Sequence, residues 1–117
     1  MEFTNNDPAS ELASVKDLIF VSESGDDNND GLTVDTPVKT LGAAYALVNG
    51  QTEATFAVNG RVAMGNVSGD YSGLSLTVGT FNGTGTLLDF QAQGNTTLTD
   101  VVVDGDTRTN GYDVVFA

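Results

Sequence analysis

The order of apolar and polar residues predicts one helix in a chain that otherwise consists of short strands. Between residues 41 and 48, apolar side chains stand at positions 41, 44, 45, 47 and 48, which is the spacing of one helical face. Thr40 or Thr36 can cap the start of this helix, and Asn49 followed by Gly50 can end it. We expect the helix to cover an apolar surface.

Outside the helix, apolar or β-branched runs are short and are separated by Gly, Asn and Asp. These runs span residues 18–22, 55–58, 61–64, 74–78, 86–90, 97–99, 101–103 and 112–116. Apolar and polar residues alternate most clearly from Leu74 to Val78, as they do in a half-buried strand. Residues 25–31 are all Gly, Asp or Asn, which predicts a loop. The largely polar residues 1–17 are expected to be a lead-in or linker.

Two all-β architectures fit these short runs. An antiparallel sandwich needs evenly spaced strands joined by turns. A parallel β-helix needs short strands separated by tight turns, with roughly twenty-odd residues in each coil. A helix before the first coil suits the second architecture, because an open solenoid end has to be covered. The pattern of residues alone leaves both open.

A resemblance to a known superfamily favours the β-helix. Phe20-Val21-Ser22, the loop that ends in Asp30-Gly31, and Thr36-Pro37-Val38-Lys39-Thr40 together resemble the N-terminal opening of pectin-lyase-like right-handed parallel β-helix proteins. The stretch from Thr97 to Gly105 is similar to one of their coils. The resemblance covers about residues 18–105. It implies an all-β fold, a short right-handed parallel β-helix with one N-terminal capping helix, in which residues 18–117 form the cap and the first coils.

The same resemblance says little about activity, because this opening precedes lyases, glycoside hydrolases, phage proteins and bacterial surface adhesins. The catalytic residues of the enzymes lie on later coils, so the resemblance implies that this chain has no catalytic residues of its own. We also expect the chain to be the first part of a longer protein, with its last coil left uncovered.

Composition excludes several classes of partner and site. The 117 residues include sixteen acidic and four basic side chains, a net charge of −12, which argues against binding to nucleic acid or to an anionic membrane surface. There is no Cys and no His, which removes thiolate metal sites, Ser-His-Asp triads and His-based zinc sites. No run approaches the roughly 20 apolar residues of a membrane span, and residues 1–17 do not have the pattern of a signal peptide.

The acidic loop is a candidate calcium site. Asp26, Asn28 and Asp30, followed by Gly31, match the first half of a calcium-binding loop, in which alternate residues direct oxygen atoms at one ion. The bidentate Glu that should follow six residues later is replaced by Pro37. Because Asp and Asn also build turns, the loop has a second interpretation that needs no ion. Calcium is the one cofactor that the sequence suggests.

Three other groups of residues contain the side chains of a possible site. Asp104 and Asp106 are close enough in sequence for the paired carboxylates of a glycosidase, but a turn explains them better. Arg61 and Arg108 are the basic residues of the strand region that a polysaccharide lyase would need, and ordinary surface charge explains both. Among the scattered aromatic residues, Tyr71 lies between Gly, Asp and Ser, and is the one predicted to be exposed and to stack on a carbohydrate ligand.

The sequence therefore predicts a non-catalytic module of a microbial extracellular or cell-surface protein, adhesin-like, that serves for display or ligand binding. A glycan or a host protein is the expected ligand, and self-association through the last coil is a further expectation. The alternative is the N-terminal fragment of a β-helical polysaccharide lyase or glycoside hydrolase. A trimeric phage tailspike module is a third hypothesis.

Overall fold

The structure, a computed structural model, describes residues 18–117, except for the side chains at positions 82 and 83. The predicted lead-in at 1–17 lies outside the described residues. The elements, in chain order, are β1 (Leu18–Ser22), α2 (Leu41–Leu47), β2 (Glu53–Ala63), β3 (Ser75–Leu88), β4 (Asn95–Thr99), β5 (Val102–Asp104) and β6 (Val114–Phe116).

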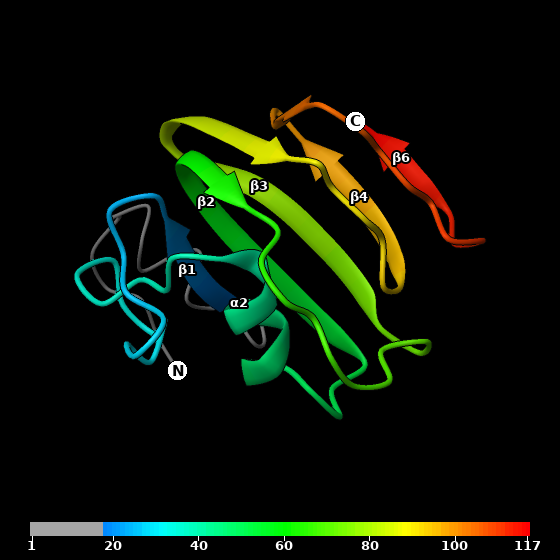
Figure 1. Ribbon diagram of the computed structural model, residues 1–117, viewed down its shortest axis with the longest axis horizontal. Coiled ribbons are helices and arrows are strands. Elements are labelled where there is room, and N and C mark those ends of the chain that lie inside the picture. The colour runs from blue at the N-terminus through cyan, green and yellow to red at the C-terminus, as the bar shows by residue number, and fades with distance from the viewer. Residues whose placement is uncertain (1–17) are drawn as a thin grey trace, which may run out of the picture.

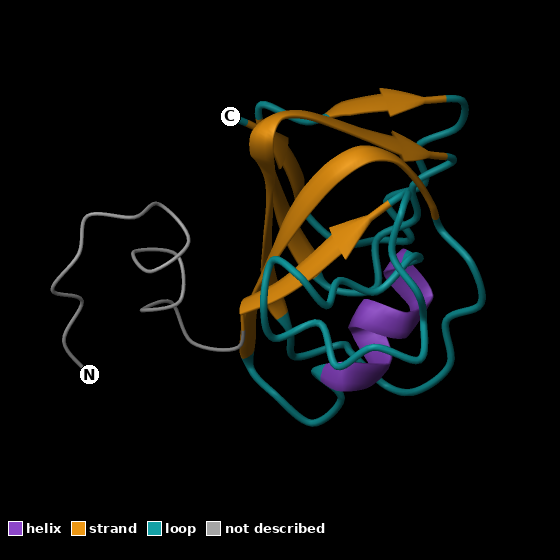
Figure 2. Cartoon of the chain, turned by 90° about the vertical axis from the view of Figure 1, so that its left-hand side faces the viewer, coloured by secondary structure: helices purple, strands orange, loops and turns teal. Residues whose placement is uncertain are grey.

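The strands form one sheet in the order β1-β2-β3-β4-β6 (Figure 1). Strand β5 pairs with residues 86–88 of β3, beyond the residues of β3 that pair with β4. The pairings recorded between these strands are parallel. The sheet is strongly curved, and the helix lies on its concave side together with the connecting loops (Figure 2). Because parallel strands all start at the same end of the sheet, each connection has to bring the chain back to that end.

The prediction of a short right-handed parallel β-helix is wrong. The described residues form a compact sheet with one short helix, and the sheet is not a solenoid of stacked coils. The runs 55–58 and 61–64, which we expected to be separate, belong to the single strand β2, which continues through a register shift between Val58 and Gly60. Strand β3 likewise continues through the Gly-rich and Thr-rich residues 79–85. Because turn-like residues lie inside the strands, these runs do not become the separate short strands of a coil.

The predicted helix is confirmed, although it caps no solenoid. Thr40 is the N-cap, and its hydroxyl oxygen accepts a hydrogen bond from the Ala43 N–H at 3.2 Å. The carboxylate of Asp27 accepts bonds from the Lys39 and Thr40 N–H groups at 2.8 and 2.9 Å, and so ties the acidic loop to the start of the helix. Helix α2 contacts β1 and β2.

Two apolar clusters lie on opposite faces of β1, where successive side chains point to opposite sides. Ile19 and Val21 join the main core beneath the helix. Leu18 and Phe20 form a second cluster with Ala57 of β2. All five residues of β1 are buried as a result. The main core also contains Val38, Leu41, Tyr45, Phe56, Val58, Val62, Tyr71, Leu74, Leu76, Val78, Leu87, Phe90 and Leu98.

The two edges of the sheet differ. The outer edge of β1 is covered by the loop that follows it, since the Phe20 N–H donates to Gly31 O at 2.8 Å, and Val38 exchanges bonds with Phe20 and Ser22. At the other edge, β6 pairs with β4 and with no further described strand. The side chains of Val115 and Phe116 there are 53% and 60% exposed.

Candidate binding cavity beside strand β1

A cavity of about 350 Å³ opens where β1, the acidic loop and the middle of β2 and β3 meet. This volume is within the usual range for small-ligand sites, roughly 300–1,000 Å³. Its lining combines aromatic and aliphatic side chains with hydroxyl, amide and carboxylate groups. The lining residues are Phe20, Val21, Ser22, Ser24, Gly25, Asp26, Asn29, Val34, Asp35, Pro37, Ala57, Asn59 and Phe81.

The apolar part of the lining comes from the second cluster. The rings of Phe20 and Phe81 pack edge to face, with centroids 5.4 Å apart and planes at 84°. Phe20 is 4% exposed, so it is fixed in position, whereas Phe81 is only partly buried. Strands β1 and β3 position these two rings through β2, which lies between them in the sheet.

The polar part comes from the end of β1, from the middle of β2 and from the acidic loop. The hydroxyls of Ser22 and Ser24 are hydrogen-bonded to each other at 3.0 Å. The amide of Asn29 donates to Pro37 O at 2.9 Å, which joins two segments of the loop that line the cavity. Asn59 accepts a bond from the Thr84 hydroxyl at 3.4 Å through its side-chain oxygen. No hydrogen bond to another described residue is recorded for the side chain of Asp35.

The two carboxylates of the candidate calcium loop, Asp26 and Asp30, accept hydrogen bonds from different partners. One carboxylate oxygen of Asp26 accepts from the Asn28 N–H at 2.9 Å, which is a local turn. Asp30 accepts from the Leu32 N–H at 3.0 Å and from the Thr36 hydroxyl at 2.8 Å. These bonds, the Leu32 N–H first, hold the pKa of Asp30 below its usual value. Residues 18–117 contain no group of three or more Asp, Glu, His or Cys side chains placed to hold a metal ion. The calcium site stays a prediction from the sequence.

The expectation that Tyr71 is exposed is wrong. Its side chain is buried, and its hydroxyl donates to Ser68 O at 2.9 Å. Its ring lies 5.1 Å from that of Tyr45 on the helix, tilted by 55°. Burial raises the pKa of the Tyr71 hydroxyl. Neighbouring Gly, Asp and Ser residues suggest an exposed loop, but the loop folds back so that the ring completes the main core and offers no face to a ligand.

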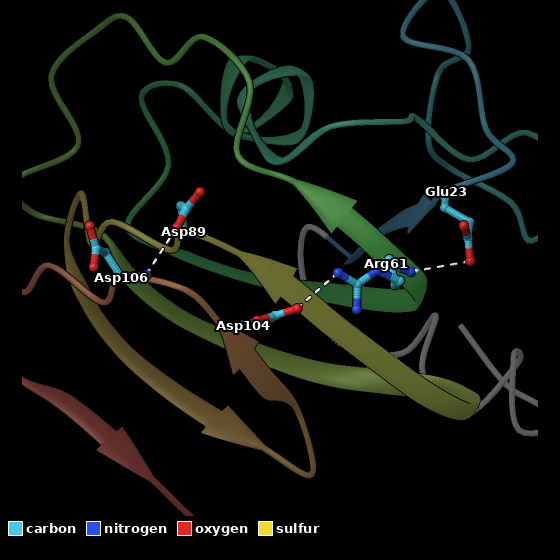
Figure 3. Close-up of polar contacts among 5 residues, drawn as sticks. All are labelled: Glu23, Arg61, Asp89, Asp104 and Asp106. Carbon is cyan, nitrogen blue, oxygen red and sulfur yellow. Dashed lines mark hydrogen bonds and ion pairs between the residues drawn. The ribbon is translucent and has the colours of Figure 1, made fainter.

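Arg61 and Asp104, two of the residues considered above for catalysis, are engaged in a structural contact (Figure 3). The guanidinium of Arg61 forms an ion pair with the Asp104 carboxylate at 2.8 Å. The pair joins β2 to β5, and both side chains are exposed. The Arg61 N–H donates to the Glu23 carboxylate at 3.2 Å. The Asp106 N–H donates to the Asp89 carboxylate at 2.9 Å, which is a turn contact. The Asp104 carboxylate is directed at Arg61, and the side chain of Asp106 lies well apart from it, so the two do not form a facing pair (Figure 3).

Sequence reasoning missed most of the cavity. It singled out Asp26, but the aromatic pair and Asn59 become neighbours of the acidic loop only when three parallel strands align. The alternation within β1, which places Phe20 on the face opposite to Val21, was the available clue.

In the part of the chain that the structure describes, no helix is long and apolar enough to cross a membrane. No protein family, curated protein or solved structure matches the chain.

Proposed function

We propose that this chain is a non-catalytic binding module of an extracellular or cell-surface, adhesin-like protein, and that the cavity beside β1 binds one neutral sugar unit of a glycan. The observation that carries the proposal is the lining of that cavity, in which a phenyl ring and several hydrogen-bonding side chains converge.

A sugar ring has a face of C–H groups and an edge of hydroxyl groups, and the cavity offers a partner to each. The ring of Phe81 supplies an apolar surface, supported by the buried ring of Phe20. The carboxylates of Asp26 and Asp35 accept hydrogen bonds from hydroxyl groups, and the Asn59 amide nitrogen donates them. Bonds to a carboxylate are the stronger kind, because the acceptor is charged.

Charge favours a neutral sugar over an acidic one. The chain has a net charge of −12, and two of the cavity side chains are carboxylates. A uronate or a sialic acid would bring a further negative charge to this surface and be repelled. A high net charge also keeps a displayed protein soluble, which is compatible with the proposed setting.

The test is a screen on an array of neutral and acidic glycans, followed by titration of the best neutral glycan into isotopically labelled protein. We expect amide signals of Ser24, Asp35 and Asn59 to shift, and Asp35→Ala to weaken binding at least about tenfold, because a hydrogen bond to a charged group contributes about 1.5–3 kcal/mol. Glu53→Ala, which removes an exposed carboxylate outside the cavity, is the matched control and should bind normally.

If no neutral glycan on the array shifts these amide signals, the proposal is refuted. Equal affinity of the wild-type and Asp35→Ala proteins would place the binding elsewhere.

A further inference from the structure

The connection between α2 and β2 contains an asparagine followed by a glycine, Asn49-Gly50. The same pair of residues occurs at three other places, at positions 59–60, 82–83 and 110–111. In such a pair the peptide nitrogen of the glycine can attack the side-chain amide of the asparagine, because glycine has no Cβ atom to obstruct the approach. The fold treats the four pairs differently.

Two of the pairs lie inside strands, where the backbone cannot turn to bring the reacting groups together. Asn59-Gly60 belongs to β2, and the carbonyl of the peptide that links the two residues accepts the Glu23 N–H at 3.1 Å. The side-chain oxygen of Asn59 is also held, by the hydroxyl of Thr84 at 3.4 Å. The pair at 82–83 lies within β3. Reaction at either pair would first require the sheet to open locally.

The pair Asn110-Gly111 is held through its side chain. The Asn110 Nδ2 donates to Ala92 O at 2.9 Å, so the nitrogen that would have to leave is bonded to the main chain of a distant segment. The Tyr112 N–H donates to Thr109 O at 2.8 Å and closes a turn around the pair. Both bonds would have to break before the side chain could reach the glycine nitrogen.

Asn49-Gly50 has no such restraint. Both residues are exposed, and they follow the end of α2, where neither helix nor sheet pairing fixes the backbone. No hydrogen bond to another described residue is recorded for the Asn49 side chain or for the Gly50 N–H. A Cβ atom placed on Gly50 would have no heavy atom within 4 Å, so the space around this residue is open.

We infer that Asn49 is a site of spontaneous deamidation, and that it reacts before the other three asparagines in the folded protein. The Gly50 nitrogen forms a bond to Asn49 Cγ, the bond from Cγ to Nδ2 breaks, and ammonia leaves with the proton of the attacking N–H. Water, the one co-reactant, then opens the cyclic imide at either carbonyl and leaves aspartate or isoaspartate. The inference goes beyond the proposed glycan site and does not depend on it.

The modification would change both the charge and the connection at this point. The net charge of −12 becomes one unit more negative, and the new carboxylate lies at the carbonyl end of α2, where the helix dipole disfavours it. Isoaspartate also inserts one carbon atom into the main chain, inside the turn that the Gln51 N–H closes by donating to Val48 O at 3.0 Å. We therefore expect a lower urea midpoint in the modified protein.

The test is incubation of the folded 117-residue chain in mildly alkaline buffer, with a parallel sample in urea. Cleavage after Lys and Arg gives peptides that span residues 40–61, 62–108 and 109–117, and fragmentation in the mass spectrometer distinguishes Asn49 from Asn59 within the first. We expect Asn49 to react at a similar rate in both samples. Folding should slow the other three pairs at least about tenfold, because they react only from locally open states.

Asn49→Gln keeps the side-chain amide but would have to close a larger ring, so it should abolish the first gain of negative charge seen by ion-exchange chromatography. Asn110→Gln is the matched control and should leave this gain unchanged. Faster reaction of any other pair in the folded protein would overturn the inference. A gain of charge that persists in Asn49→Gln at the wild-type rate would also overturn it, because another residue would then be its source.

Discussion

The ring of Tyr45 on the helix meets the ring of Phe56 on β2 edge to face, with centroids 5.3 Å apart and planes at 85°. Both side chains are completely buried. The Tyr45 hydroxyl is buried with them and has no hydrogen-bond partner among the described residues. The backbone of Gln93 lies near it but does not complete a bond of good geometry. At this contact the helix is therefore held by packing of apolar surface, and not by a polar contact of the Tyr45 hydroxyl.

We expect Tyr45→Phe to leave the free energy of unfolding unchanged or to raise it by up to about 1 kcal/mol, because it removes a buried hydroxyl whose desolvation is not offset by a hydrogen bond. The matched variant is Tyr71→Phe, which loses the bond to Ser68 O and should cost about 1 kcal/mol. Urea unfolding followed by circular dichroism measures both. A larger loss in Tyr45→Phe than in Tyr71→Phe would show that the Tyr45 hydroxyl is bonded after all.

Stability should fall at alkaline pH through the same two residues. Burial raises the pKa of Tyr45 well above its ordinary value of 10.0, and raises that of Tyr71 in the same direction. Above pH 10 the unfolded chain loses these protons while the folded chain keeps them. The free energy of unfolding then decreases with pH by up to about 1.4 kcal/mol per unit for Tyr45, and it is unaffected below pH 10. Urea titrations at a series of pH values should show a shallower decrease in Tyr45→Phe; equal slopes in the two proteins would contradict this.

Gly42 should be essential although it lies in a helix. Ala normally stabilises a helix by about 1 kcal/mol relative to Gly. Here the Gly42 N–H donates to Met64 O at 2.8 Å, and a Cβ atom would overlap the backbone carbonyl of Asn66. We expect Gly42→Ala to destabilise the fold by about 1–3 kcal/mol, as overpacking does. Ala46→Gly, at an exposed position of the same helix, is the control and should cost about 0.5–1 kcal/mol, as measured by the urea midpoint.

Thermal unfolding with calcium and with a chelator decides between the two interpretations of the acidic loop. A ligand that binds only the folded state stabilises it by about 2.7 kcal/mol at a hundredfold excess over its dissociation constant. We expect no calcium-dependent shift, because the Asp26 and Asp30 carboxylates already accept bonds that build the turn. Asp30→Ala should lower the melting temperature equally in both buffers. A calcium-dependent rise that Asp26→Ala or Asp30→Ala abolishes would instead make the loop a metal site.

Local patterns predicted the helix and the places where strands lie, because these depend on neighbouring residues. The spacing of Leu41, Ala44 and Tyr45 and the cap at Thr40 are sufficient for the helix. The same patterns failed at Asn59-Gly60, which is turn-like in isolation. Within β2 the flanking strands supply parallel partners on both sides, and Gly60 adopts a φ of 78° that accommodates the register shift. Pairing between distant segments overrode the local preference and produced one continuous sheet.

The candidate site was less predictable than the fold for a related reason. An exposed Tyr71 was inferred from its polar neighbours, and only the packing against Tyr45 shows that it is buried. The contact between Phe20 and Phe81 joins residues that no short motif connects. A cavity defined by strand register has no local signature in the sequence.

The unlike edges of the sheet set a limit on aggregation. A cross-β fibril grows because every molecule added leaves a fresh edge for the next. Here the loop that follows β1 already bonds to Phe20 and Ser22, so no further strand can add at this edge. The acidic loop therefore also blocks fibril growth from the β1 side of the sheet.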